Sequence, residues 1–217
     1  MPKITEVSPQ KKNPRRFNIF LDGVFTFGAD EDLIVDHRLV VGKVLELSDV
    51  DKLLFEAEVG KLVERVYGLL GIRIRSEKEI RDYLQKLSFK RRIKEKEEIS
   101  EQTIELLIDK LKQKGLINDL EFARSWIESR KKKKGIRVIV QELYQKGIDK
   151  EIIEDVISRQ SSDVTEEQTA KKLLEKKLKS WQNLPPLQFK KKAYEFLLRR
   201  GFQYSLVKDL VERILIK

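Results

Sequence analysis

The longest run of like charge in the sequence is Arg130 to Lys134, one arginine followed by four lysines. With Arg137, six positive charges gather between two segments of helical periodicity. Such a cluster suits the phosphates of a nucleic-acid backbone, each of which steepens the salt dependence of duplex binding by about 0.9 in log–log slope. Complementing a helix C-terminus would need only one or two lysines. The cluster therefore indicates contact with a polyanion or with an acidic protein surface.

Further basic clusters lie on both sides of this run and recur with the repeats described below. Together they could form a discontinuous basic track. Trp126 and Trp181 could stack on bases, but both lie on apolar helical stripes and are predicted to pack in the core. The candidate partner-binding residues are Arg73, Arg75, Arg81, Arg124, Arg130, Lys131, Lys132, Lys133, Lys134, Arg137, Lys190, Lys191, Lys192, Arg199 and Arg200.

The charge is unevenly distributed along the chain. Residues 1–60 hold 8 basic and 11 acidic side chains, a net charge of −3, whereas residues 61–217 hold 38 basic and 25 acidic ones, a net charge of +13. Clustered Lys and Arg speed association with a polyanion and release counterions from it. A general solubilising role of Lys and Glu would give a similar composition, so composition alone leaves both interpretations open.

The residue types needed for common kinds of catalysis are scarce. His37 is the single histidine and there is no cysteine, which excludes a Ser-His-Asp triad, thiolate chemistry and a His-rich metal site. Neighbouring carboxylates, Glu154 with Asp155 or Glu166 with Glu167, could serve a metal-dependent nuclease, but they fall on predicted solvated helix faces. We therefore expect no enzyme activity and no cofactor.

The sequence also bears on the compartment. No apolar run approaches the ~18 residues that a membrane span needs, and the N-terminal residues lack the apolar core of a signal peptide. The absence of cysteine is consistent with a reducing environment. We expect a cytoplasmic protein with no membrane partner.

The elements that would position the basic clusters begin with a β-hairpin. Apolar residues alternate over Phe17 to Leu21, and β-branched and aromatic residues fill Val24 to Phe27. Asp22-Gly23 between them is a strong hairpin signal, because a type I′ turn needs positive φ at both positions. Two strands alone are marginal, so we expect a third at Lys43 to Leu47, and a short helix near Asp30 to His37.

From about Ser48 the apolar spacing becomes that of helices, and a segment recurs 54 residues later with its turn glycine, Gly147, becoming Gly201. A weaker copy lies upstream around Ile99, at an offset of 49. Self-similarity at about 50 residues is typical of a repeat array, in which neighbouring units bury each other's faces. The paired apolar positions are Leu143 with Leu197, Ile148 with Phe202, Ile152 with Leu206, Ile153 with Val207, Val156 with Leu210 and Ile157 with Val211.

Each repeat is predicted to hold three helices. Asn118-x-x-Glu121 and Ser76-x-x-Glu79 are candidate capping boxes, and Gly147 suits a left-handed position that ends a helix. We predict a mainly α fold of three tandem three-helix, helix-turn-helix-like repeats in an elongated, curved array, preceded by a small region that contains the β-hairpin. The expected limits are 1–60 for the N-terminal region and 61–115, 116–160 and 161–217 for the three repeats.

Three stretches of the chain resemble the bacterial RecX family: "VYGLLGIRIRSEKEIRDYL", "GLINDLEFARSWIESR" and "KKGIRVIVQELYQKGIDKEIIEDVI". The hairpin and the third repeat extend the likeness to nearly the whole chain. Two features depart from the family pattern: Ile136 stands where an aromatic residue is frequent, and "FKRRIKEKEE" lengthens the first repeat. The matching residues are Leu69, Leu70, Arg73, Arg75, Ser76, Asn118, Asp119, Phe122, Ala123, Trp126, Arg130, Lys134, Gly135, Glu142, Leu143, Lys146, Gly147 and Ile148.

The resemblance implies a non-catalytic protein that binds the RecA–DNA filament and inhibits RecA ATP hydrolysis and strand exchange in recombinational repair and the SOS response. Contact with several filament subunits at once would raise the affinity without any deep pocket. The expected partners are RecA on DNA and, directly, single- or double-stranded DNA, and we expect the chain to be a monomer. The alternative is an autonomous helix-turn-helix-type DNA-binding protein, whose basic residues would contact phosphates instead of acidic patches on RecA.

Overall fold

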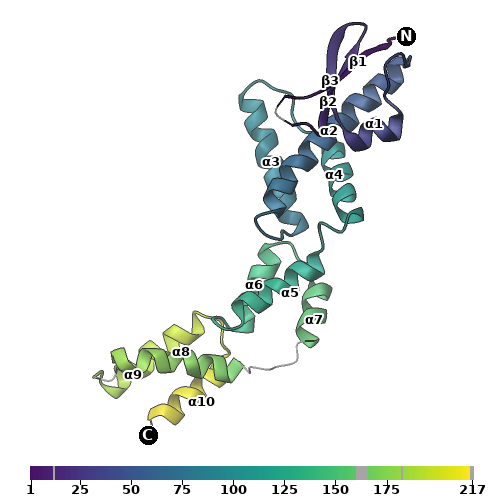
Figure 1. Cartoon of the computed structure of the whole chain (residues 1–217). Coiled ribbons are helices and arrows are strands. Elements are labelled where there is room, and N and C mark those ends of the chain that lie inside the picture. Colours follow the sequence, from purple (N-terminus) through teal and green to yellow (C-terminus); the bar gives the residue numbers. More distant parts are fainter. Residues whose placement is uncertain (12, 160–165, 182, 216–217) are drawn as a thin grey trace. The chain divides into compact units, whose positions relative to one another are not determined.

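A computed structural model describes residues 1–11, 13–159, 166–181 and 183–215 of the chain. The chain forms two compact units, one of Met1–Arg75 with Ile80–Ile117 and one of Ser76–Glu79 with Asn118–Lys217. A small sheet and the first helices belong to the first unit, and most later helices to the second (Figure 1). The prediction of a mainly helical protein with an N-terminal β region is confirmed.

The bounds of the elements follow from the backbone hydrogen bonds. The strands are β1 (Ile4–Pro9), β2 (Arg16–Leu21) and β3 (Val24–Asp30). The helices within the described residues are α1 (Glu31–His37), α2 (Leu47–Leu70), α3 (Glu77–Ile93), α4 (Glu101–Gln113), α5 (Asp119–Arg130), α6 (Ile136–Gln145), α7 (Lys150–Ser158), α8 (Glu166–Trp181), α9 (Pro186–Leu198) and α10 (Tyr204–Leu215).

The three strands form an antiparallel sheet in the order β1-β2-β3. The predicted type I′ turn between β2 and β3 is confirmed, because Asp22 and Gly23 have φ of +48° and +83°. α1 follows β3, and the Asp30 side chain accepts a hydrogen bond from the Leu33 N–H at its start. The short helix predicted near this position is therefore confirmed.

The third strand of the sheet differs from the prediction. The segment from Lys43 to Leu47 is not a strand, and Val44 makes only an isolated bridge with Lys3. β1 pairs with β2 instead. β1 ends in Pro9, which an edge strand tolerates but which weakens the sequence signal for a strand.

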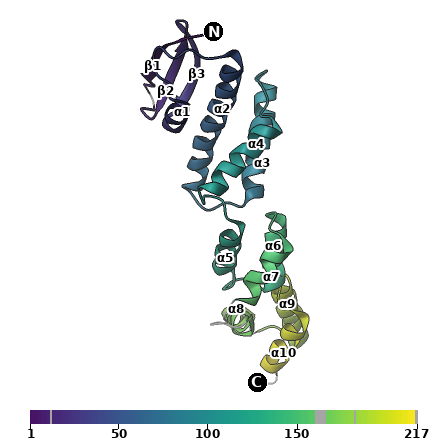
Figure 2. The same ribbon diagram turned by 90° about the vertical axis from the view of Figure 1, so that its right-hand side faces the viewer.

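α2 contributes to both hydrophobic cores of the first unit. Leu53 and Ala57 pack in the core of the sheet and α1. Further along the same helix, Leu62 and Val66 pack in the core that α2 shares with α3 and α4. Figure 2 shows α2 extending from the sheet to these two helices. A single continuous helix therefore joins the sheet to the first three-helix cluster.

Two further three-helix clusters make up most of the second unit. α5, α6 and α7 enclose a core that includes Phe122, Leu143 and Ile153. α8, α9 and α10 enclose another, which includes Leu174 and Phe202. The predicted three-helix organisation is confirmed for these repeats.

Two turns 54 residues apart have the same geometry. Gly147 and Gly201 have φ of +77° and +88°, as predicted for glycines that end a helix. In the first turn the Ile148 N–H donates to the Leu143 carbonyl over 3.1 Å, and in the second Phe202 donates to Leu197 over 3.4 Å. The hydrogen bonds that satisfy the last carbonyls of α6 thus recur at the end of α9.

The predicted helix starts are also confirmed. The Asn118 side chain accepts from the Glu121 N–H over 3.0 Å, and Ser76 Oγ accepts from the Glu79 N–H over 3.2 Å. The residue limits of the repeats stay predictions. The limit between residues 60 and 61 falls inside α2, and the limit between residues 160 and 161 lies outside the described residues.

Candidate polyanion-binding surface

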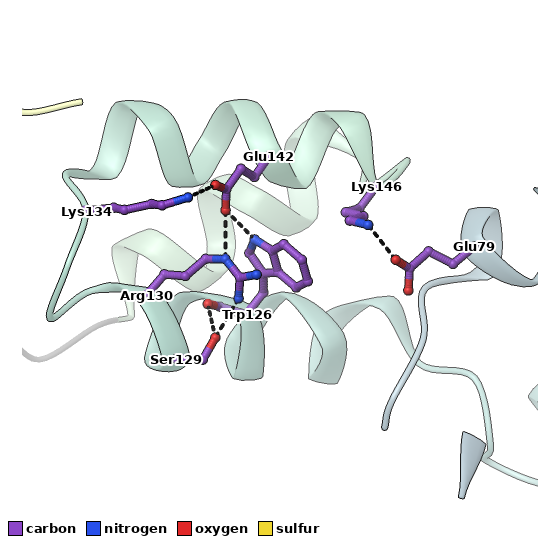
Figure 3. A network of polar contacts seen from close by, with 7 residues as sticks. All are labelled: Glu79, Trp126, Ser129, Arg130, Lys134, Glu142 and Lys146. Carbon is purple, nitrogen blue, oxygen red and sulfur yellow. Dashed lines mark hydrogen bonds and ion pairs between the residues drawn. The ribbon is translucent and has the colours of Figure 1, made fainter. Parts of the chain in front are cut away.

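A polar network occupies the junction between α5 and α6 (Figure 3). The guanidinium carbon of Arg130 lies 3.3 Å from the centroid of the Trp126 ring. Arg130 Nε lies 2.8 Å from Glu142 Oε2, and Trp126 Nε1 donates to that same oxygen over 3.0 Å. Lys134 Nζ donates to the other carboxylate oxygen, Oε1. Two predicted partner-binding residues, Arg130 and Lys134, therefore direct their charge at Glu142 within the repeat.

This network sets the protonation of Glu142. Burial of the side chain, which is 20% exposed, raises the pKa of the carboxyl. The hydrogen bonds from Lys134 and Trp126 and the charge of Arg130 outweigh burial, so the pKa lies below its ordinary value. Glu142 is accordingly a carboxylate at neutral pH, and it holds the indole and the two cationic groups in one arrangement.

A second ion pair stands at the other end of α6. Lys146 Nζ lies 2.5 Å from Glu79 Oε1, and the Glu79 side chain is only 12% exposed (Figure 3). The Lys146 ammonium also lies 5.2 Å from the centroid of the Trp126 ring. Trp126 thus lies close to two cationic groups. Its ring also stacks on Phe122 with a centroid distance of 5.3 Å, which confirms its predicted packing role.

Several other predicted residues also have contacts within the chain. Arg81, in the first unit, forms a two-pronged pair with Glu105 through Nη1–Oε1 and Nη2–Oε2 distances of 2.6 and 2.8 Å. Lys131 Nζ lies 2.5 Å from Glu128 Oε1, and Lys190 Nζ lies 3.9 Å from a Glu212 oxygen. The remaining ones are Arg73, which donates to the Ile74 carbonyl; Arg199, which donates to the Glu195 carbonyl; and Arg200, which stacks on Phe196. Arg75 is half-buried, and among the described residues its Nε has no hydrogen-bond partner.

A third group of predicted residues is exposed and unpaired. Within the described ranges, the structure shows no ion pair or side-chain hydrogen bond for these cations, all of which belong to the second unit. They are Arg124, Lys132, Lys133, Arg137, Lys191 and Lys192. These six retain a charge that a partner could neutralise.

Sequence reasoning missed three lysines of α8. A groove of about 660 Å³ is lined by Lys132 from the turn between α5 and α6 and by Lys172, Lys176 and Lys179 from α8. Thr169, Leu173 and Glu175 complete the lining. The spacing of the α8 lysines, i, i+4 and i+7, places them on one helix face and was readable in the sequence. In contrast, nothing in the sequence shows that the turn containing Lys132 lies beside α8; the structure shows it.

Two backbone contacts hold that turn. The Gly135 N–H donates to the Arg200 carbonyl over 2.8 Å. The Ile136 N–H donates to Glu166 Oε1 over 2.6 Å. Gly135 has no side chain that could cap α6, so a carboxylate from the start of α8 accepts from the first helical N–H. The turn carrying Lys132 is thereby attached to both α8 and the end of α9.

Comparison with known proteins identifies the family of this chain. The chain matches the RecX N-terminal domain over residues 2–46, the second RecX three-helix domain over 118–157 and the third over 165–211. The regulatory protein RecX of Bacillus subtilis (strain 168) is 36% identical over 217 residues, covering 99% of this chain and 78% of that protein. This chain belongs to the RecX family. The resemblance found in the sequence is thus confirmed.

Other RecX proteins show the same likeness. The regulatory protein RecX of Listeria monocytogenes serovar 1/2a (strain EGD-e) is 34% identical, over 95% of this chain and 73% of that protein. A crystal structure of regulatory protein RecX matches with a TM-score of 0.76 and 26% identity, over 98% of this chain and all of that one. RecX from Lactobacillus salivarius matches with a TM-score of 0.59 and 25% identity, over 73% of this chain and 97% of that one.

The carboxylate pairs considered for metal-dependent chemistry have other contacts in this RecX chain. Asp155 pairs with Arg159 at 2.6 Å, Glu166 accepts from the Ile136 N–H, and Glu167 pairs with Arg213 at 2.7 Å. In the part of the chain that the structure describes, no three His, Asp or Glu side chains are grouped so that they could hold a metal ion. Likewise, none of the described helices is both long and apolar enough to cross a membrane. The relatives are named regulatory proteins.

Proposed function

We propose that this RecX protein is a non-catalytic regulator of the RecA recombinase. It binds the RecA filament on DNA, as a monomer in the cytoplasm, and inhibits ATP hydrolysis and strand exchange during recombinational repair and the SOS response. The observation that carries this proposal is RecX family membership along nearly the whole chain. The second unit supports it, since exposed cations there remain available to a partner.

We divide the candidate residues by the contacts that each makes within the chain. We assign contact with the filament to the exposed and unpaired cations Arg124, Lys132, Lys133, Arg137, Lys191 and Lys192. We assign to Arg130 and Lys134 the positioning of the α5–α6 junction, because both act on Glu142. The predicted residues that already have an internal contact would have to exchange it for one with a partner; they are Arg73, Arg81, Lys131, Lys190, Arg199 and Arg200. Arg75 also stays a candidate.

The test is the ATP hydrolysis of RecA on single-stranded DNA, titrated with this protein at two salt concentrations. Inhibition at well below one molecule per RecA monomer is the expected result, because a filament can be blocked at a few sites. Binding to bare DNA is measured in parallel. No effect on RecA together with tight, salt-sensitive DNA binding would contradict the proposal and favour an autonomous DNA-binding protein.

The proposal also excludes nuclease action. Labelled single- and double-stranded DNA incubated with the protein and magnesium should remain intact on a denaturing gel. Cleavage that a chelator abolishes would contradict a purely regulatory role.

A further inference from the structure

The lysine groove of the second unit has the composition of a polyanion site. Four ammonium groups, those of Lys132, Lys172, Lys176 and Lys179, face one carboxylate, that of Glu175, which gives a net charge of +3. All five side chains are exposed, and the structure shows no ion pair for any of them within the described residues. The groove therefore holds unneutralised charge at a point where the surface is hollowed.

We propose that this groove binds the phosphate backbone of nucleic acid directly, without RecA. The row of α8 lysines is extended along the helix, since Lys172 and Lys179 are separated by about 10 Å at 1.5 Å rise per residue. A small anion would be held by groups that converge on one point. An extended row of charges instead matches a polymer that presents phosphates in succession.

The contribution of Lys132 distinguishes the groove from a solvated helix face. Lys132 comes from a different segment, and the two backbone hydrogen bonds from Gly135 and Ile136 attach that segment to the third three-helix cluster. Solubility alone would not require a lysine of one repeat to lie beside a lysine row of the next. The convergence of two segments indicates a binding surface.

The residue types favour nucleic acid over an acidic protein surface. Protein interfaces are enriched in arginine and aromatic residues and depleted in lysine. The cations of this groove are all lysines, and none of its lining residues is aromatic or an arginine. Lysine acts as a point charge on phosphates, and without aromatic side chains the groove has no platform for stacking bases. Binding should therefore be independent of sequence and should include duplex DNA.

The test measures fluorescence anisotropy of a labelled duplex and of a labelled thymidine single strand over a range of salt concentrations, with no RecA present. The triple variant K172Q/K176Q/K179Q removes the α8 lysines and keeps side-chain length and helix propensity. The control, K52Q/K94Q/K208Q, removes the same charge from exposed positions outside the groove. Unchanged melting temperatures establish that both variants fold.

The groove variant should lose at least about tenfold in duplex affinity at low salt, and its log–log salt slope should become shallower by about 2 to 3, at 0.9 for each lost phosphate contact. The control should change little. Three results would overturn the proposal: no DNA binding by the unmodified protein, equal losses in both variants, or unchanged DNA binding with a loss of action on RecA. The last would assign the groove to an acidic protein surface and leave the proposed function standing.

Discussion

The N–H of Gly135 donates a hydrogen bond to the carbonyl oxygen of Arg200 over 2.8 Å, joining the start of α6 to the end of α9. A similar junction lies at the start of α3, where Ser76 Oγ donates to the Lys146 carbonyl over 2.8 Å. Lys146 and Arg200 are themselves related by the 54-residue offset. Within the second unit, the end of a helix twice accepts a hydrogen bond from the start of another.

The Gly135 junction leaves no room for a side chain. A Cβ at this position would lie 2.6 Å from the Phe202 backbone nitrogen and closer still to the Gly201 carbonyl. Gly135→Ala should therefore lower the stability by about 1–3 kcal/mol, because backbone atoms must move apart. Thermal unfolding measures the effect. The control is Gly68→Ala in α2, where an added Cβ would meet no described atom within 4 Å other than those of its chain neighbours and of its own helix backbone. The higher helix propensity of alanine should there stabilise the protein by up to about 1 kcal/mol.

Gly147 combines a left-handed backbone with a close neighbour. Gly115 has a similar φ, +67° against +77°, but a Cβ there would meet nothing within 4 Å, whereas at Gly147 it would lie 2.6 Å from the Lys78 Cβ. Gly115→Ala should cost about 1–2 kcal/mol from the backbone alone. Gly147→Ala should cost more in the same unfolding measurement. Equal losses would show that Lys78 moves aside freely.

The Glu142 network should make the stability depend on pH. The pKa of Glu142 is lower in the folded protein than its ordinary value of 4.5, so its contribution is present above about pH 4.5 and is lost as the pH falls through the folded pKa. Glu142→Gln should destabilise the protein by about 1–3 kcal/mol at pH 7, where it leaves two cations facing a neutral amide. The difference between the two proteins should shrink on acidification. Unfolding curves from pH 7 to pH 3 test this, and a constant difference would contradict it.

The four consecutive lysines should separate into two classes. Lys132 and Lys133 are exposed and have no ion pair among the described residues, so replacing both with alanine should leave the melting temperature unchanged and weaken the inhibition of RecA, with a smaller salt dependence. Lys134 binds Glu142, so Lys134→Ala should reduce stability by about 1 kcal/mol. Unchanged inhibition by the double variant would remove Lys132 and Lys133 from the proposed contact.

Local signals predicted much of the fold. Asp22-Gly23, the Asn118 cap and Gly147 each require a particular backbone conformation within a few residues, and the structure shows it. β1 was not predicted, because its place depends on pairing with β2, and Pro9 at its end weakens the strand pattern. The spacing of apolar residues predicted the helices of the repeats for a similar reason, because the residues that form the buried face of a helix all lie within that helix.

The candidate site was less accessible to sequence reasoning. Their positive charge places Arg130 and Lys134 among the predicted partner-binding residues, yet both act on Glu142, which lies after the turn, in α6. Net charge along the chain cannot show which cation already has a partner, because that depends on how α5 packs against α6. The lysine row of α8 had a readable spacing, but only the fold places Lys132 next to it.

The continuity of α2 has a consequence for how the chain can be divided. A fragment that starts after the sheet would leave Leu53 and Ala57 uncovered, and one that ends before α3 would leave Leu62 and Val66 uncovered. Either cut exposes a contiguous apolar helix face, which favours aggregation. The N-terminal sheet is thus no detachable appendage, and shortened forms of the protein should keep the first unit whole from the sheet to α4.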